Sequence, residues 1–205
     1  MNIFWWLLRS SKTELKIVLA TLFVLIALPT ISIVIFASAG IELVSESLAS
    51  VNPTSHLVEI FDANGHKVRE LELSTVWPGV GKVTSEFGSD RGSVYGVHTG
   101  IDIANVAGTP ITTFMEGKVI SVDNINNSSC GINVMIDHGY GIHSLYCHMS
   151  ATAATLGATV KPGDIIGYVG ATGLATGDHL HFQINLLGIP VNPRTFMVGE
   201  PPRSR

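Results

Sequence analysis

The fold is decided by residues 132–148, which read INVMIDHGYGIHSLYCH. Two runs rich in strand-forming residues, 132–137 and 142–148, flank a turn that contains Gly139 and Gly141. Glycine readily adopts the backbone angles that reverse a chain, so this stretch predicts two adjacent antiparallel strands.

Similar short apolar runs, separated by glycine-containing turns, lie on both sides of this stretch at 83–87, 100–104, 110–114, 118–122, 165–169 and 180–185. No amphipathic helix of ordinary length interrupts them. Residues 77–198 are therefore predicted to form an all-β domain of antiparallel strands.

A different composition marks the N-terminal part of the chain. Residues 17–41 contain no charged side chain and are long enough to cross a bilayer as one helix. Basic residues precede this span and acidic residues follow it, namely Arg9, Lys12 and Lys16, then Glu42 and Glu46. The positive-inside rule then places residues 1–16 in the cytoplasm and the β domain outside the cell membrane, in a single-pass topology.

The alternative interpretation of this N-terminal part is a cleaved secretory signal, because Ala37-Ser38-Ala39 has the small-x-small pattern of a cleavage site. The apolar run is longer than the hydrophobic region of a signal peptide, which favours an uncleaved transmembrane anchor.

Three further segments complete the predicted organisation. Residues 42–56 are interpreted as a linker, 57–76 as a β-hairpin around Asn64-Gly65, and 199–205 as a disordered tail. The net charge of −4 and the lack of a basic cluster exclude nucleic-acid binding by electrostatic attraction.

Five polar residues within the β domain suggest a zinc site: His98, Asp102, His148, His179 and His181. Imidazoles and a carboxylate suit a divalent metal. A structural zinc usually has four ligands that include cysteines, whereas a catalytic zinc has three ligands and an open position. The chain has only two cysteines, so the pattern favours three ligands with two histidines left for proton transfer.

Strand geometry adds three expectations about this site. His179 and His181 share a face because side chains alternate along a strand. The same alternation, with His148 facing the site, predicts that Cys147 faces away and is no ligand. On a straight strand His98 and Asp102 would lie roughly 13 Å apart, so a bend at Gly100 is expected to bring both onto one ion.

The chain resembles the lysostaphin-type (LytM-like) zinc endopeptidases, which cut peptide bonds in bacterial peptidoglycan. The resemblance covers about residues 77–196 and includes His98-Thr99-Gly100-Ile101-Asp102 and His179-Leu180-His181. The other matching segments are 84–88, Arg91, 108–110, 117–119, 136–139, 146–150, 160–167, 170–173 and 176–178.

This resemblance implies that His98, Asp102 and His181 bind one zinc ion, and that His148 and His179 act as acid/base and transition-state-stabilising groups. It also implies a compact antiparallel β sandwich of the duplicated hybrid motif type, with an open groove that Tyr146 is a candidate to line. The implied substrate is a cross-link or bridge peptide of peptidoglycan.

Three positions depart from the family pattern: Asp178 stands where proline is common, Gln183 where glutamate is common, and Cys147 where a small residue is common. A disulfide between Cys130 and Cys147 is compatible with the predicted hairpin register, which leaves it open. The remaining histidines, His56, His66, His138 and His143, are expected to be surface or structural residues.

Three functions fit the sequence. The first is a membrane-anchored zinc endopeptidase of the cell wall. The second is a catalytically silent relative that binds peptidoglycan or activates another hydrolase, although all five site positions are filled. The third keeps the chemistry but opens the wall locally for a secretion or conjugation machine.

Overall fold

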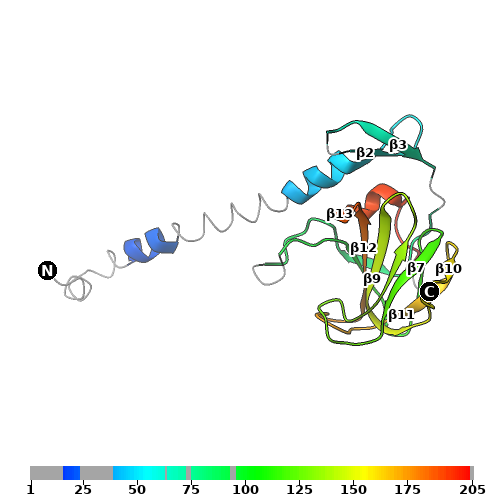
Figure 1. Cartoon of the computed structure of the whole chain (residues 1–205). Helices are drawn as coiled ribbons and strands as arrows, with labels where there is room; N and C mark the ends of the chain where they lie inside the picture. The colour runs from blue at the N-terminus through cyan, green and yellow to red at the C-terminus, as the bar shows by residue number, and fades with distance from the viewer. Residues whose placement is uncertain (1–15, 24–38, 63, 73–74, 93–95, 204–205) are drawn as a thin grey trace.

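The computed structural model describes residues 16–23, 39–62, 64–72, 75–92 and 96–203 (Figure 1). Residues 16–23 and 39–48 are helical, while 24–38, which hold most of the predicted membrane span, lie outside the described residues. Among the described residues, the helices are too short or too polar to cross a membrane. The anchor over 17–41 stays a prediction.

A small sheet of three antiparallel strands precedes the main domain: β1 (Ala49–Val51), β2 (Val58–Phe61) and β3 (Lys67–Leu71). The hairpin predicted at Asn64-Gly65 joins β2 to β3, with Gly65 at a φ of 80°. Asp62 stabilises this turn because its carboxylate accepts the N–H groups of Asn64 and His66.

The segment 42–56, interpreted from the sequence as a linker, has regular structure over part of its length. Residues 42–48 belong to a helix, and β1 pairs with β2 along the hairpin. The buried Ser45 hydroxyl accepts the N–H of Asn192 at 2.7 Å, and Ala49 joins the hydrophobic core. These long-range contacts hold the segment in place, and they leave no periodic signal in its sequence.

The main sheet confirms the predicted all-β, antiparallel architecture. Its continuous path runs β10-β7-β8-β9-β12-β5-β4, with β11 pairing with β9 and β6, and β13 pairing with β12. The strands are β4 (Lys82–Ser85), β5 (Ile101–Ala104), β6 (Pro110–Thr112), β7 (Gly117–Asp123), β8 (Ile132–Asp137), β9 (Ile142–Thr152), β10 (Thr159–Val160), β11 (Ile165–Val169), β12 (His179–Leu186) and β13 (Ile189–Val191), followed by the 3-10 helix η1 (Pro193–Phe196).

Strand β9 connects two parts of the main sheet. Its first half pairs with β8 and β12, and its second half pairs with β11, which carries β6 (Figure 1). Phe114, which follows β6, packs on Phe182 of β12 with ring centroids 5.4 Å apart. The hydrophobic core therefore lies between the β6–β11 arm and the β9–β12 face.

Strand β12 shows how this core positions the site. Its alternate residues Leu180, Phe182, Ile184 and Leu186 are fully buried. His179 and His181 occupy the intervening positions, so they lie on the opposite face of the strand. Burial of the apolar set fixes the register of β12 and with it the direction of both imidazoles.

His138 and Tyr146 belong to a buried polar network in the core. His138 Nε2 lies 2.6 Å from Ser144 Oγ, and that hydroxyl lies 3.0 Å from the Tyr146 hydroxyl, which accepts the N–H of Phe114. Burial lowers the pKa of His138 to about 4. His138 is structural, as expected, but the sequence-based placement of Tyr146 in the groove is wrong because its ring is fully buried.

The C-terminal residues up to 203 pack on the domain. The sequence predicted a disordered tail over residues 199–205 instead. The carbonyl of Pro202 accepts the N–H of Gly81 at 2.8 Å, and Pro201 is buried. Arg194 forms ion pairs with Glu86 and Glu200. Proline-containing ends can pack in this way without the periodic pattern that sequence analysis detects.

Candidate functional site

The three predicted ligands come together through strand pairing and one bend in the chain. Asp102 of β5 and His181 of β12 are direct register partners, so their side chains leave the same face of the sheet. His98 lies before β5, and the chain bends at Gly100, as expected, which returns its imidazole to the same point.

Donor atoms of these residues form a nearly equilateral triangle. His98 Nε2 lies 3.0 Å from His181 Nδ1, His181 Nδ1 lies 3.0 Å from Asp102 Oδ1, and His98 Nε2 lies 3.1 Å from the same oxygen. Tetrahedral zinc with bonds of about 2.0–2.1 Å requires ligand atoms roughly 3.3 Å apart. Two nitrogens and one oxygen at this spacing fit a divalent metal with a fourth position left open.

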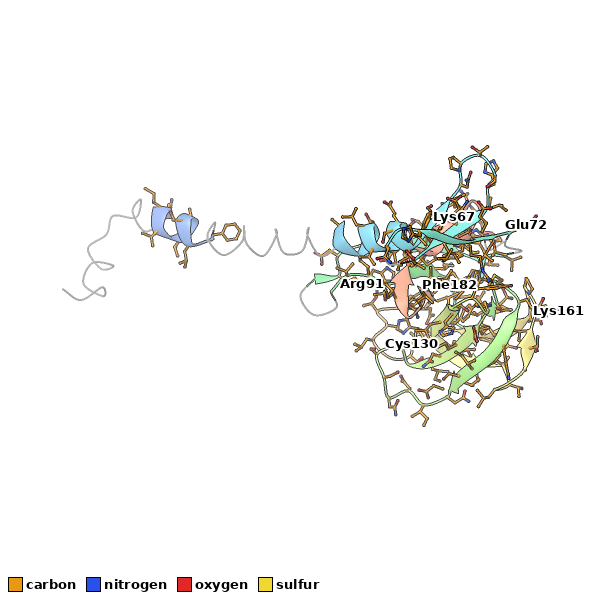
Figure 2. The ribbon with its side chains drawn as sticks, turned by 45° about the horizontal axis from the view of Figure 1, so that its top comes forward. Lys67, Glu72, Arg91, Cys130, Lys161 and Phe182 are labelled. Carbon is orange, nitrogen blue, oxygen red and sulfur yellow. A yellow bond between two sulfur atoms is a disulfide. The ribbon has the colours of Figure 1, made fainter. Side chains whose placement is uncertain are left out.

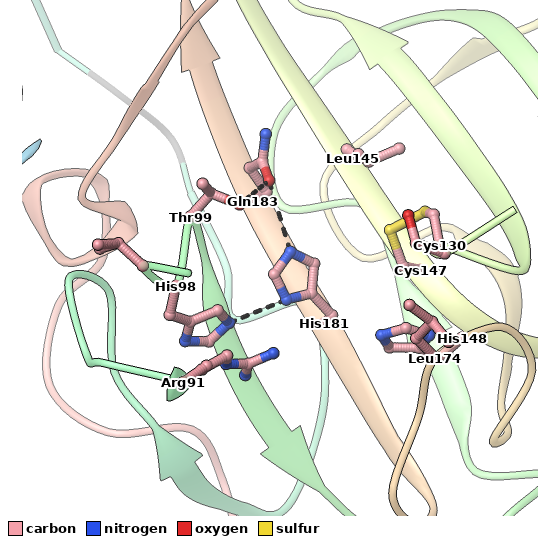
Figure 3. Close-up of a pocket in the computed structure, with 12 residues that line it drawn as sticks. Arg91, His98, Thr99, Cys130, Leu145, Cys147, His148, Leu174, His181 and Gln183 are labelled. Carbon is pink, nitrogen blue, oxygen red and sulfur yellow. Dashed lines mark hydrogen bonds between the residues drawn. A yellow bond between two sulfur atoms is a disulfide. The ribbon is translucent and has the colours of Figure 1, made fainter. Parts of the chain in front are cut away.

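Contacts behind the donors fix the orientation of both imidazoles. His98 Nδ1 lies 2.8 Å from the main-chain carbonyl of Glu86, so Nδ1 carries the proton and Nε2 presents its lone pair. His181 Nε2 points toward Gln183 Oε1 at 3.5 Å, and that oxygen accepts the hydroxyl of Thr99 at 2.6 Å (Figure 3).

Asp102 has different neighbours at its two oxygens. Oδ1 faces His98 and His181, while Oδ2 contacts the guanidinium of Arg91. Burial alone would raise the pKa of Asp102, but hydrogen bonds with His181 and His98 outweigh it and hold the pKa far below its usual range. Asp102 is therefore a carboxylate at neutral pH, which is the form that binds a metal.

The two remaining histidines lie beside this cluster. The rings of His148 and His179 are 4.7 Å apart, and each has its Nδ1 on a main-chain carbonyl, at 2.7 Å from Thr172 and 2.8 Å from Gly177. A carbonyl only accepts hydrogen bonds, so Nδ1 is the donor in each ring. His179 Nε2 is buried without a hydrogen-bond partner among the described residues and lies 3.7 Å from Asp102 Oδ1.

Burial also controls the charge of the imidazoles. It lowers the pKa of His148 to about 4, with the nearby His179 and His181 acting in the same direction. It likewise lowers the pKa of His181, although the carboxylate of Asp102 opposes this effect. These two residues are neutral at pH 7, as ligation or proton acceptance requires.

Gly100 has a role beyond the bend. A Cβ at this position would lie 2.4 Å from the carbonyl oxygen of Phe182 and 2.9 Å from Cε1 of His181. The φ of Gly100 is not positive, so the glycine is needed for space and not for an unusual backbone angle. It lets β5 approach the ligand imidazole closely.

The predicted direction of Cys147 is wrong. Cys147 is the register partner of His181 and lines the same groove, because a bulge at His148 with a φ of 63° interrupts the alternation along β9. Figure 3 shows that Cys147 forms a disulfide with Cys130 beside His148. The exclusion of Cys147 as a ligand therefore holds for another reason, since its sulfur is bonded to Cys130.

The groove in front of the candidate metal donors contains apolar and polar side chains. It is lined by His148, His181 and the disulfide, together with Arg91, Thr99, Leu145, Leu174 and Gln183 (Figure 3). In Figure 2, Arg91 and Cys130 lie on the same side of the domain, on different loops.

Sequence reasoning missed the main-chain carbonyls of Glu86, Thr172 and Gly177, which set the tautomers of three histidines. Any residue supplies a carbonyl, so these positions carry no signal in the side-chain pattern. It also gave Arg91 no role, although Arg91 contacts Asp102.

Comparisons with known proteins agree with this geometry. Residues 96–193 match Peptidase family M23. The DD-carboxypeptidase/endopeptidase Mpg of Neisseria meningitidis serogroup B is 39% identical over 105 residues, which cover 51% of this chain and 24% of that protein. The peptidoglycan DD-endopeptidase ShyA of Vibrio cholerae is 38% identical over 95 residues, which cover 46% and 22%.

Among solved structures, the catalytic domain of the prophage-encoded M23 protein EnpA from Enterococcus faecalis is 36% identical. The alignment covers 58% of this chain and 92% of that domain, with a TM-score of 0.51. The chain thus spans about a quarter of the length of the two curated relatives but nearly the whole of a solved catalytic domain. With its fold, its ligand cluster and this match in hand, we assign the chain to peptidase family M23.

Proposed function

We propose that this protein is a zinc-dependent endopeptidase that hydrolyses peptide cross-links or bridges of bacterial peptidoglycan. The observation that carries the proposal is the triangle of His98, Asp102 and His181 donors with two more histidines beside it, on the wall of an open groove. The peptidoglycan peptidases named among the relatives support this substrate class.

His98, Asp102 and His181 would hold the zinc ion. When bound, zinc supplies Lewis-acid chemistry and a water nucleophile at neutral pH. The chain provides a rigid frame for it: β5 and β12 fix two ligands through their register, and the carbonyl of Glu86 fixes the ring of the third.

His148 and His179 would move protons and stabilise charge that develops on the scissile peptide. Each has its Nδ1 on a carbonyl, so Nε2 is the atom that can accept a proton and later return it to the leaving amine. The low pKa of His148 keeps this imidazole neutral before reaction, which a general base needs. In its protonated form the imidazolium also stabilises negative charge nearby.

A digestion experiment tests this proposal. Purified sacculi are incubated with the zinc-supplemented full chain, and released muropeptides are identified by mass spectrometry. We expect peptide cleavage that disappears in His181→Ala and persists in His143→Ala, a control histidine outside the groove. Binding to sacculi without cleavage would instead support the catalytically silent function.

We also propose that residues 17–41 anchor the protein in the cell membrane, with the N-terminus in the cytoplasm and the peptidase domain outside. The charge asymmetry around the apolar run supports this orientation. The disulfide between Cys130 and Cys147 supports an oxidising, extracytoplasmic environment for the domain.

Membrane fractionation of cells, followed by protease treatment of intact spheroplasts, tests this topology. The full chain is expected in the membrane fraction, with its C-terminal domain degraded from outside. A domain that is protected until the cells are lysed would contradict the orientation.

A further inference from the structure

We propose that the Cys130–Cys147 disulfide is a positioning element for His148, the candidate proton-transfer residue; this inference rests on the proposed function. The disulfide joins Cys130 and Cys147, which are 17 positions apart in the chain. The disulfide lies in the groove wall directly beside His148 (Figure 3).

Cys130 is joined to the bulge of β9 at two points. Its sulfur is bonded to Cys147, and its carbonyl accepts the N–H of His148 at 2.9 Å. His148 has a φ of 63°, a backbone conformation that is unfavourable for residues other than glycine. The disulfide therefore keeps the loop that ends at Cys130 in contact with the backbone of His148.

The same loop holds the segment that orients the ring of His148. Leu174 N–H donates to the carbonyl of Ser129 at 2.8 Å, and Gly173 N–H donates to Asn126 Oδ1 at 2.6 Å. Ile132 N–H donates to Thr172 Oγ1 at 3.0 Å. Three hydrogen bonds thus connect residues 126–132 to 172–174.

The two segments touch backbone to backbone. A Cβ on Gly131 would lie 2.5 Å from the carbonyl carbon of Thr172, and a Cβ on Gly173 would lie 2.4 Å from the carbonyl oxygen of Ser129. A shift of one segment must therefore move the other.

The end of this chain of contacts is the carbonyl of Thr172, which accepts the Nδ1 proton of His148 at 2.7 Å. This bond selects the tautomer with an unprotonated Nε2 and sets the plane of the ring. Residues 124–129 are exposed, so without the disulfide only these hydrogen bonds and backbone contacts hold the loop in place. Loss of the cross-link would then loosen the Thr172 carbonyl and the ring together.

A double-mutant cycle on the full chain tests this inference, with Cys130→Ala/Cys147→Ala and His148→Ala made separately and together. We expect the cysteine variant to lose about tenfold in kcat, with KM and zinc content changed by less than about twofold. In the His148→Ala background, the cysteine substitutions should change kcat by less than about twofold, because the positioned group is absent. Ser128→Ala, in the same exposed loop, is the matched control and should match wild type.

A second readout does not depend on hydrolysis. Nitrogen-15 NMR of the imidazoles at pH 7 should show a single Nδ1–H tautomer for His148 in wild type and in Ser128→Ala, and a mixture of tautomers in the cysteine variant. A wild-type chain that hydrolyses nothing would contradict the proposed function alone, because the tautomer still reports the positioning.

The inference is overturned by any of three results: an unchanged tautomer with unchanged kcat, equal losses in the presence and absence of His148, or loss of zinc from the cysteine variant. The last result would mean that the disulfide supports the metal ligands instead of His148.

Discussion

Asp102 Oδ1 lies 3.0 Å from His181 Nδ1, and the two residues are direct partners in the β5–β12 ladder. The hydrogen bonds of the sheet therefore set the distance between two candidate metal donors. His98 joins them from the segment before β5.

Removal of one donor from this cluster should abolish metal binding at the site. For His181→Ala we expect zinc content, measured by mass spectrometry of the dialysed protein, to fall from about one ion per chain to background, because two ligands rarely retain zinc. His143→Ala is the control, since that residue lies outside the ligand cluster. Full zinc content in His181→Ala would refute this ligand assignment.

Substitution of Gly100 should damage the site through crowding. In Gly100→Ala, the new Cβ meets the carbonyl of Phe182 at 2.4 Å, so β5 or β12 must shift. Overpacking of this kind costs about 1–3 kcal/mol, and we expect a lower melting temperature together with weaker zinc binding. Gly177→Ala is the matched control, because a Cβ there would have no neighbour within 4 Å. Equal behaviour of the two variants would contradict the close-approach role of Gly100.

The fold and the five polar residues of the candidate site could be predicted from this sequence because apolar side chains at strand spacing and a set of histidines with one aspartate are both visible in it. The choice of His98, Asp102 and His181 as the three ligands rested on the family resemblance, and the structure brings these three residues together. The face of β9 on which each side chain lies could not be predicted. Alternation counted from His148 predicts that Cys147 faces away, but a one-residue bulge at His148 brings both residues to the same face. Tyr146, which the family resemblance made a candidate to line the groove, is instead fully buried beside Phe182 on the core face.

The ordered contacts of residues 42–51 and 199–203 could not be predicted for a different reason. Ser45 pairs with Asn192, and Gly81 pairs with Pro202. Each contact joins distant parts of the chain and uses at least one main-chain group, which any residue possesses. The local sequence pattern therefore does not predict that these segments pack on the domain.

Acid should destabilise the fold partly through His138. Its pKa is about 4 in the folded protein against an ordinary value of 6.5, so below pH 6.5 the unfolded chain binds a proton that the folded chain excludes. Stability from the neutral imidazole is thus present above pH 6.5 and lost as the pH falls to about 4.

Chemical denaturation of wild type and His138→Ala at several pH values measures this effect. The difference in free energy of unfolding should shrink by about 3 kcal/mol at most between pH 7 and pH 4, because a shift of one pKa unit is worth about 1.4 kcal/mol. A difference that is constant across this range would contradict the burial-induced shift.

The disulfide should also stabilise the fold. It links residues 17 positions apart, and a cross-link that closes a loop of about this length stabilises the folded state by about 3 kcal/mol. Cys130→Ala/Cys147→Ala should therefore melt on the order of 10 °C lower than wild type. Reducing agent should lower the melting temperature of wild type but not of the variant, and a shift in both would show that the reagent acts elsewhere.

Hydrolysis of a defined cross-linked muropeptide in ¹⁸O-labelled water tests the central claim most directly. With zinc-loaded full chain, we predict two peptide products, one with a new amino group and one whose new carboxylate carries one ¹⁸O atom; neither product should form with His181→Ala. An intact muropeptide after incubation with the zinc-loaded chain, under conditions in which a known peptidoglycan endopeptidase cleaves it, would contradict the account.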